Sequence, residues 1–207
     1  MTPDELRADL VAQGRSLFER GLTPGRTGNL SVRHRDGVLI TPTGSCLGFL
    51  HPGRLARADL DGTLLDGPTP SKELPLHLAM YRARPGLAAV AHLHSPHAVA
   101  VATLAGLDPD SALPALTPYF VLRVGRLPLV PYGPPGSPFL PAALARHAAG
   151  AHAALLASHG SIAGGATLAE AVDAVEEIEA TARIYLLTRG LPARPLTPEQ
   201  IAELRAR

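Results

Sequence analysis

The sequence has few of the features that build disulfide frameworks, membrane anchors or charged tails. Its 207 residues include one cysteine, Cys46, which excludes an intramolecular disulfide and favours a reducing, cytoplasmic setting. Apolar runs such as 153–157 are far shorter than the roughly 20 residues that cross a bilayer, and we expect neither a signal peptide nor a membrane span. A net charge of +1 without a basic block argues against nucleic acid as a partner. A small-molecule ligand is the better expectation.

Apolar residues are plentiful enough to build a core. They make up 46% of the chain against 18% charged residues, a balance that excludes wholesale disorder. The length suits a single core, and neither an internal repeat nor a linker is visible. We therefore expect one globular domain over residues 1–207.

Local patterns predict the first elements. Thr2-Pro3-Asp4-Glu5 is typical of a capped helix start, and apolar spacing extends that helix to about Arg20. The strand-like runs 29–33 and 38–41 flank Asp36-Gly37, a pair that favours the positive φ angles of a tight hairpin. Asp61-Gly62 indicates another turn, and an irregular loop over 68–71 precedes a helix with Pro75 in its first turn.

In the second half, strands and helices alternate. The pattern predicts strands at 88–94, 127–131 and 153–158, a helix at 98–104, a glycine-rich loop after 158, and a long amphipathic helix over 167–189. A short terminal helix begins at Thr197. The expected fold class is α/β with a mixed sheet.

Three histidines suggest a metal site. His92 and His94 flank one residue of a strand, which turns both imidazoles to the same face. His159 ends another apolar strand and supplies a third ligand, leaving a coordination position open for substrate as catalytic zinc requires. A structural site would need a fourth ligand, often cysteine, and Cys46 alone cannot close it. The alternatives are polar histidines at 92 and 94 and a backbone-bonded histidine at 159.

Glu73 is a candidate acid/base. It stands just before the proline-started helix, where its carboxylate can point out from the helix N-terminus. The alternative is a first-turn glutamate that only complements the helix dipole.

Three short segments offer amides, hydroxyls and one cation to a phosphate group. Each alone is more often a turn. The three segments are Gly28-Asn29, Thr43-Gly44-Ser45 and Ser71-Lys72.

The other six histidines, His77 among them, have no possible partner at a spacing that indicates a site, and we assign them no role.

These motifs together resemble the class II aldolase/adducin family in order and spacing across nearly the whole chain. Longer runs around 14–21, 39–47, 117–125 and 130–132 are similar to its 3-oxo-tetronate 4-phosphate decarboxylase subfamily, and Lys72 fits that subfamily. Arg26-Thr27 departs from the usual small residues before Gly-Asn. The motifs are Gly28-Asn29-Leu30-Ser31, Thr43-Gly44, Pro70-Ser71-Lys72-Glu73, His92-Leu93-His94 and Ser158-His159-Gly160.

The resemblance implies a three-layer fold with a mostly antiparallel sheet flanked by helices, and zinc held by the three histidines, one ion per chain. It also implies a homotetramer with active sites between subunits, where Tyr119 or Tyr132 would act across the interface. We assign the catalytic roles to Glu73 and Tyr119.

The implied reaction converts 3-oxo-tetronate 4-phosphate to dihydroxyacetone phosphate and CO2 through a metal-stabilised enediolate, which makes the chain a carbon-carbon lyase. Gly28, Asn29, Thr43, Gly44, Ser71 and Lys72 would bind the phosphate. The alternatives are a fuculose 1-phosphate or ribulose 5-phosphate type aldolase or epimerase, and an adducin-like binding module without metal.

Overall fold

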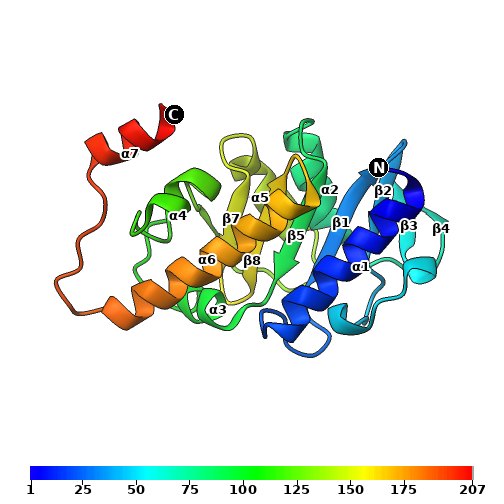
Figure 1. Ribbon diagram of the computed structural model, residues 1–207, viewed down its shortest axis with the longest axis horizontal. Coiled ribbons are helices and arrows are strands. Elements are labelled where there is room, and N and C mark those ends of the chain that lie inside the picture. Colours follow the sequence, from blue (N-terminus) through cyan, green and yellow to red (C-terminus); the bar gives the residue numbers. More distant parts are fainter. Residues whose placement is uncertain (207) are drawn as a thin grey trace.

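The computed structural model describes residues 1–206 and shows one twisted sheet with helices on both faces (Figure 1). The eight strands lie in the order β4-β3-β2-β1-β5-β8-β7-β6. Every neighbouring pair is antiparallel except β6 and β7, which are parallel. The predicted fold class, a mostly antiparallel α/β sheet flanked by helices, is confirmed.

The strands are β1 (Asn29–His34), β2 (Gly37–Ile40), β3 (Ala56–Asp59), β4 (Leu64–Asp66), β5 (Ala89–Leu93), β6 (Leu129–Val130), β7 (Ala153–Leu156) and β8 (Gly160–Gly165). The α-helices are α1 (Pro3–Glu19), α2 (Leu74–Ala83), α3 (Pro96–Ala102), α4 (Pro118–Arg123), α5 (Phe139–Ala148), α6 (Leu168–Thr188) and α7 (Pro198–Arg205). Two 3-10 helices cover Leu47–Phe49 and Pro52–Arg54. In the described residues, none of the helices combines the length and apolar character needed to span a membrane.

The sheet separates two apolar cores. Helices α1, α3 and α6 cover one face, and α2 and α5 cover the other (Figure 1). Strand β5 serves both cores by alternation, since Ala91 and Leu93 enter the first core whereas Val90 enters the second. His92 therefore points to the face that carries α2.

The helix predictions at both ends of the chain are confirmed. Thr2 and Glu5 form the expected capping box of α1, and Thr197 with Gln200 forms that of α7. The predicted apolar face of α6 is buried along its length. This long helix packs across β5 and β8, the two strands that carry the histidine motifs (Figure 1).

The glycine-rich loop predicted after residue 158 is wrong, because residues 160–165 form β8 at the centre of the sheet. A Cβ at Gly160 would overlap the carbonyl oxygen of Leu93, and one at Gly165 would press on the backbone of Ala171. Glycine here allows close packing, although it is ordinarily a sign of a loop.

Two helices were also missed. No element was predicted for the residues of helix α5, yet Leu140, Leu144 and Ala148 recur at helical spacing and are buried. Helix α4 begins at Pro118 after a Thr117 cap. The hairpin of β1 and β2 is confirmed, but the positive φ belongs to Arg35, and Gly37 is needed because a Cβ there would overlap β3.

We expect Gly160→Ala to lower the free energy of unfolding by about 1–3 kcal/mol, since the added methyl group overpacks against backbone that cannot rotate away. Urea denaturation measures the change. Gly86→Ala is the matched control, because a Cβ at Gly86 has open space and its φ is not positive. Equal stability of both variants would contradict this account of β8.

Candidate metal centre

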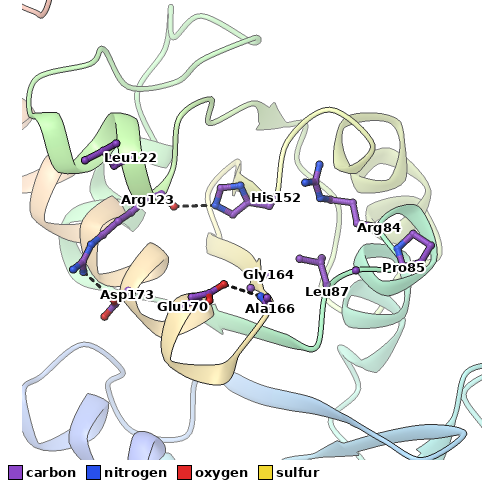
Figure 2. Close-up of a pocket in the computed structure, with 12 residues that line it drawn as sticks. Arg84, Pro85, Leu87, Leu122, Arg123, His152, Gly164, Ala166, Glu170 and Asp173 are labelled. Carbon is purple, nitrogen blue, oxygen red and sulfur yellow. Dashed lines mark hydrogen bonds and ion pairs between the residues drawn. The ribbon is translucent and has the colours of Figure 1, made fainter. Parts of the chain in front are cut away.

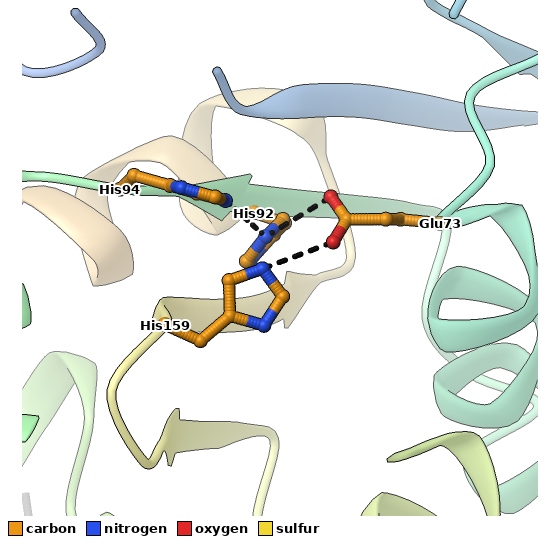
Figure 3. A group of neighbouring side chains, drawn as sticks. All are labelled: Glu73, His92, His94 and His159. Atoms are coloured by element: carbon orange, nitrogen blue, oxygen red, sulfur yellow. Dashed lines mark hydrogen bonds and ion pairs between the residues drawn. The ribbon is translucent and has the colours of Figure 1, made fainter. Parts of the chain in front are cut away.

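Four side chains predicted to carry chemistry converge at one end of the sheet (Figure 3). Glu73 is the N-cap residue of α2, His92 lies near the end of β5, and His94 follows that strand. His159 lies in the turn between β7 and β8, and the pairing of Leu93 with Ser161 brings this turn beside the end of β5. Sheet register thus joins residues that are far apart in the sequence.

The ligand atoms of the four residues lie within 4.8 Å of one another. His92 Nε2 and His94 Nε2 are 3.0 Å apart, and the Glu73 carboxylate reaches His159 Nε2 at 3.0 Å and His92 Nε2 at 3.3 Å. The three imidazole rings meet edge-on with centroids 4.7 to 4.9 Å apart. Their nitrogens therefore point into a common space.

The arrangement of His92 and His94 suits metal ligation. His92 donates its Nδ1 proton to the Ser161 carbonyl over 2.8 Å, which directs Nε2 of the same ring to the cluster. Burial, followed by the charges of His92 and His159, lowers the pKa of His94 to about 3, so His94 is neutral. His94 therefore has a nitrogen lone pair available.

Buried polar atoms in this cluster lack hydrogen-bond partners within the described chain. They include both ring nitrogens of His159 and Oε1 of Glu73, and the approach between these two residues does not have hydrogen-bond geometry. Unpartnered buried polar atoms cost free energy unless another group satisfies them. Three imidazole nitrogens beside a carboxylate fit a divalent metal ion.

Glu73 is held as a carboxylate. Burial alone would raise the pKa of Glu73, but the charge at His92 and contacts with His159, His92 and Asn29 lower it well below its usual range. The positive charge responsible can come from protonated imidazole or from a divalent ion at the same place.

Two of the predicted phosphate residues, Gly28 and Asn29, adjoin this cluster. Gly28 has φ of 78°, and a Cβ there would press against the His92 carbonyl, so only glycine fits. Asn29 is buried with both ends of its amide engaged: Nδ2 donates to Glu73 over 2.8 Å, and Oδ1 lies 2.6 Å from His77 Nε2.

Two others line a hollow of about 860 Å³ to which none of the four cluster residues contributes. Thr43 and Gly44 line it together with Arg26, the residue noted as a departure from the family pattern. Ser71 is buried and its hydroxyl accepts from the Glu73 amide, whereas Lys72 is exposed, and its charge contributes to the lowered pKa of His94. Ser71 and Lys72 are not among the residues that line this hollow.

Tyr119 and Tyr132 both lie at the surface of the single chain. Tyr119 is 61% exposed on α4, where Arg123 lies over its ring at 5.6 Å, and Tyr132 is 62% exposed after β6. The expectation that either of them acts at the site of another copy of the chain stays a prediction.

A second hollow, of about 620 Å³, lies at the opposite end of β5 and β8 (Figure 2). Its charged groups are used within the chain: Arg123 pairs with Asp173 at 3.1 Å, and Glu170 accepts from the Ala166 amide at the start of α6. None of the predicted site residues line it.

Three buried polar residues behind Glu73 were not predicted from the sequence: Ser31, His77 and Tyr81. Two spacings signal them. Glu73, His77 and Tyr81 recur every four residues along one face of α2, and Ser31 follows Asn29 by two residues on the same face of β1.

Comparison with known proteins agrees with this geometry. Residues 8–186 match the model of the Class II Aldolase and Adducin N-terminal domain. The chain is 45% identical over 199 residues to 3-oxo-tetronate 4-phosphate decarboxylase from Haemophilus influenzae, covering 96% of this chain and 95% of the relative. It is 33% identical over 206 residues to L-fuculose phosphate aldolase from Escherichia coli, covering 98% and 93%.

Among solved structures, that of YgbL from Escherichia coli superposes with a TM-score of 0.95 at 44% identity and covers 98% of this chain and 99% of that one. The fold, the ordered motifs and the extent of these matches agree. The chain belongs to the class II aldolase and adducin family.

Proposed function

We propose that this protein is a zinc-dependent lyase that converts 3-oxo-tetronate 4-phosphate to dihydroxyacetone phosphate and CO2. One observation carries the proposal: the buried group of Glu73, His92, His94 and His159 occurs in a chain 45% identical to a decarboxylase of this name over nearly its full length. The proposed domain is the whole chain, residues 1–207, and its single cysteine supports a cytoplasmic location.

His92, His94 and His159 would hold the zinc ion, one per chain. When bound, zinc supplies Lewis-acid polarisation of the 3-keto and 2-hydroxyl oxygens of the substrate. The backbone carbonyl of Ser161 accepts from Nδ1 of His92 and so directs Nε2 of that ring to the place where the ion would be held.

Glu73 would transfer the proton that replaces the carboxylate on C2. The reaction exchanges the carboxylate on C2 for hydrogen, and therefore takes up one proton for each CO2 released. Because the pKa of Glu73 is held low, the resting residue is a carboxylate, and it must take up the proton that it later delivers to C2. Among the described residues 1–206, Oε1 of Glu73 has no hydrogen-bond partner.

The phosphate would bind beside the cluster, through Gly28, Thr43, Gly44, Ser71 and Lys72. Asn29 belongs to the proposed set, but its side chain is engaged with Glu73 and His77, so its contribution would come from the backbone. Binding the remote phosphate orients the carboxylate that leaves.

A homotetramer with sites between subunits is part of the proposal. Exposed side chains such as Phe49, Tyr119, Leu122 and Tyr132 give each chain apolar surface that partner chains could cover. Tyr119 is proposed to act at the site of a neighbouring copy. Light scattering of the purified protein measures the mass.

The second candidate is a sugar-phosphate aldolase, which the 33% identity to L-fuculose phosphate aldolase favours. Both reactions can use the same metal and the same glutamate. We expect dihydroxyacetone phosphate and CO2 from 3-oxo-tetronate 4-phosphate of one configuration, with little cleavage of fuculose 1-phosphate. Cleavage of the sugar phosphate alone would replace this proposal by the aldolase. Protein purified without bound metal and inactive after zinc is added would support a binding module.

A further inference from the structure

Four polar side chains are buried in the core between β1 and α2 and are here called the relay: Asn29, Ser31, His77 and Tyr81. Asn29 and Ser31 occupy the face of β1 that points to α2, whereas Leu30 and Val32 enter the opposite core. Opposite them on α2 stand His77 and Tyr81, one and two turns beyond Glu73. All four polar side chains are at least 96% buried, in a layer otherwise filled by apolar residues.

The contacts form one continuous chain. Glu73 Oε2 is 2.8 Å from Asn29 Nδ2, and Asn29 Oδ1 is 2.6 Å from His77 Nε2. His77 Nδ1 is 2.7 Å from Ser31 Oγ, which lies 2.9 Å from the Tyr81 hydroxyl. Arg33 closes the far end, since its guanidinium lies over the Tyr81 ring at 4.7 Å and donates to the Tyr81 carbonyl.

The direction of every hydrogen bond follows from its neighbours. A carboxylate only accepts, so Asn29 presents Nδ2 to Glu73 and Oδ1 to His77. Oδ1 also only accepts, so His77 carries its proton on Nε2. Burial, followed by the charge of His92, lowers the pKa of His77 to about 3, so its ring is neutral and Nδ1 accepts from Ser31. The Ser31 oxygen in turn accepts from Tyr81.

We propose that His77 is a positioning residue: backed by Ser31 and Tyr81, it fixes the Asn29 amide so that Glu73 presents Oε1 to the metal cluster. If His77 carried its proton on Nδ1, Nε2 would face the Asn29 oxygen without a proton, and the amide would turn its NH2 away from Glu73. The functional part of this inference rests on the proposed catalytic role of Glu73.

The consequence is that the two oxygens of Glu73 are not equivalent. Oε2 receives the Asn29 amide, whereas Oε1 has no hydrogen-bond partner in the described chain and lies 3.0 Å from His159 Nε2. Oε1 is therefore the atom that takes up and delivers the proton. The relay stops the carboxylate from rotating during turnover.

The test compares His77→Leu, which removes both ring nitrogens, with His77→Gln, which keeps an N–H donor. We expect His77→Leu to lower kcat by about 10–100-fold, as loss of an outer-shell partner typically does, with KM and zinc content little changed. His77→Gln should recover part of that loss. Tyr81→Phe, which removes only the last hydroxyl, should have a smaller effect in the same direction and covers the case in which the His77 variants do not fold.

His34→Leu is the matched control. His34 is a buried histidine on β1, the strand that carries Asn29 and Ser31, and its ring nitrogens have no hydrogen-bond partner in residues 1–206. The readout independent of activity is a crystal structure of each folded variant with zinc. We expect Asn29 Nδ2 to leave Glu73 in His77→Leu, or Glu73 to shift in Tyr81→Phe, but neither in His34→Leu.

If the Asn29–Glu73 hydrogen bond were retained in His77→Leu and Glu73 were unmoved in Tyr81→Phe, or if the kcat loss equalled that of His34→Leu, the relay would be overturned. If the wild-type protein released no CO2, the proposed function would fail, and the crystal structures would still decide whether His77 positions Glu73.

Discussion

Glu73→Gln is expected to lower kcat by about 10²–10⁴-fold, the range in which a general acid/base contributes, while the protein keeps about one zinc ion per chain. Glutamine preserves the size of the side chain and can still meet Asn29, but its amide cannot carry the proton to C2. The three histidine nitrogens that would hold the metal are untouched. Steady-state kinetics and metal analysis of the same sample measure both effects.

Glu170→Gln is the matched control, because Glu170 also stands beside a helix N-terminus but lies at the opposite end of β8. We expect near-normal turnover from it. Near-normal turnover in Glu73→Gln would remove Glu73 from the proposed mechanism. Loss of zinc in parallel with turnover would instead make Glu73 a metal ligand.

His94→Ala is expected to lower both zinc content and turnover. It removes one of three nitrogens that face a common space, and the remaining two leave an incomplete ligand set. Turnover should fall on the order of 10³-fold, because Lewis-acid stabilisation amounts to several kcal/mol. Metal analysis after dialysis and an assay in a fixed excess of zinc separate weaker binding from lost chemistry.

His147→Ala provides the comparison, since His147 lies on α5 outside the cluster. It should retain zinc and activity. If His94→Ala kept a full equivalent of zinc and normal turnover, the three-histidine site would be wrong.

The parts of the site that the sequence predicted are those set by short-range geometry. Period two along a strand places His92 and His94 on one face, and a proline-started helix places Glu73 at its N-terminus. The histidines and Glu73 meet only because β5 pairs in register with β8 and with β1. No local sequence pattern specifies these registers. Resemblance to a family supplied that information in advance.

The errors came from residues whose meaning depends on tertiary contacts. Gly160 and Gly165 suggested a loop, but the strands around them approach so closely that only glycine fits. His77 received no role because its partners lie on another element: Asn29 and Ser31 align with it only when β1 packs against α2. The role of Tyr119 depends on a second copy of the chain and stays a prediction.

The central claim is that Glu73 delivers a proton to the carbon that CO2 leaves. The most direct test runs the reaction of the zinc-loaded protein in D2O, reduces the dihydroxyacetone phosphate enzymatically to chiral glycerol 3-phosphate, and locates the deuterium on its hydroxymethyl carbon by NMR. The account predicts release of CO2 and one deuterium on the new hydroxymethyl carbon, in a single stereochemical configuration, because a fixed carboxyl group delivers it from one side. A label spread equally over both configurations, or no release of CO2, would contradict it.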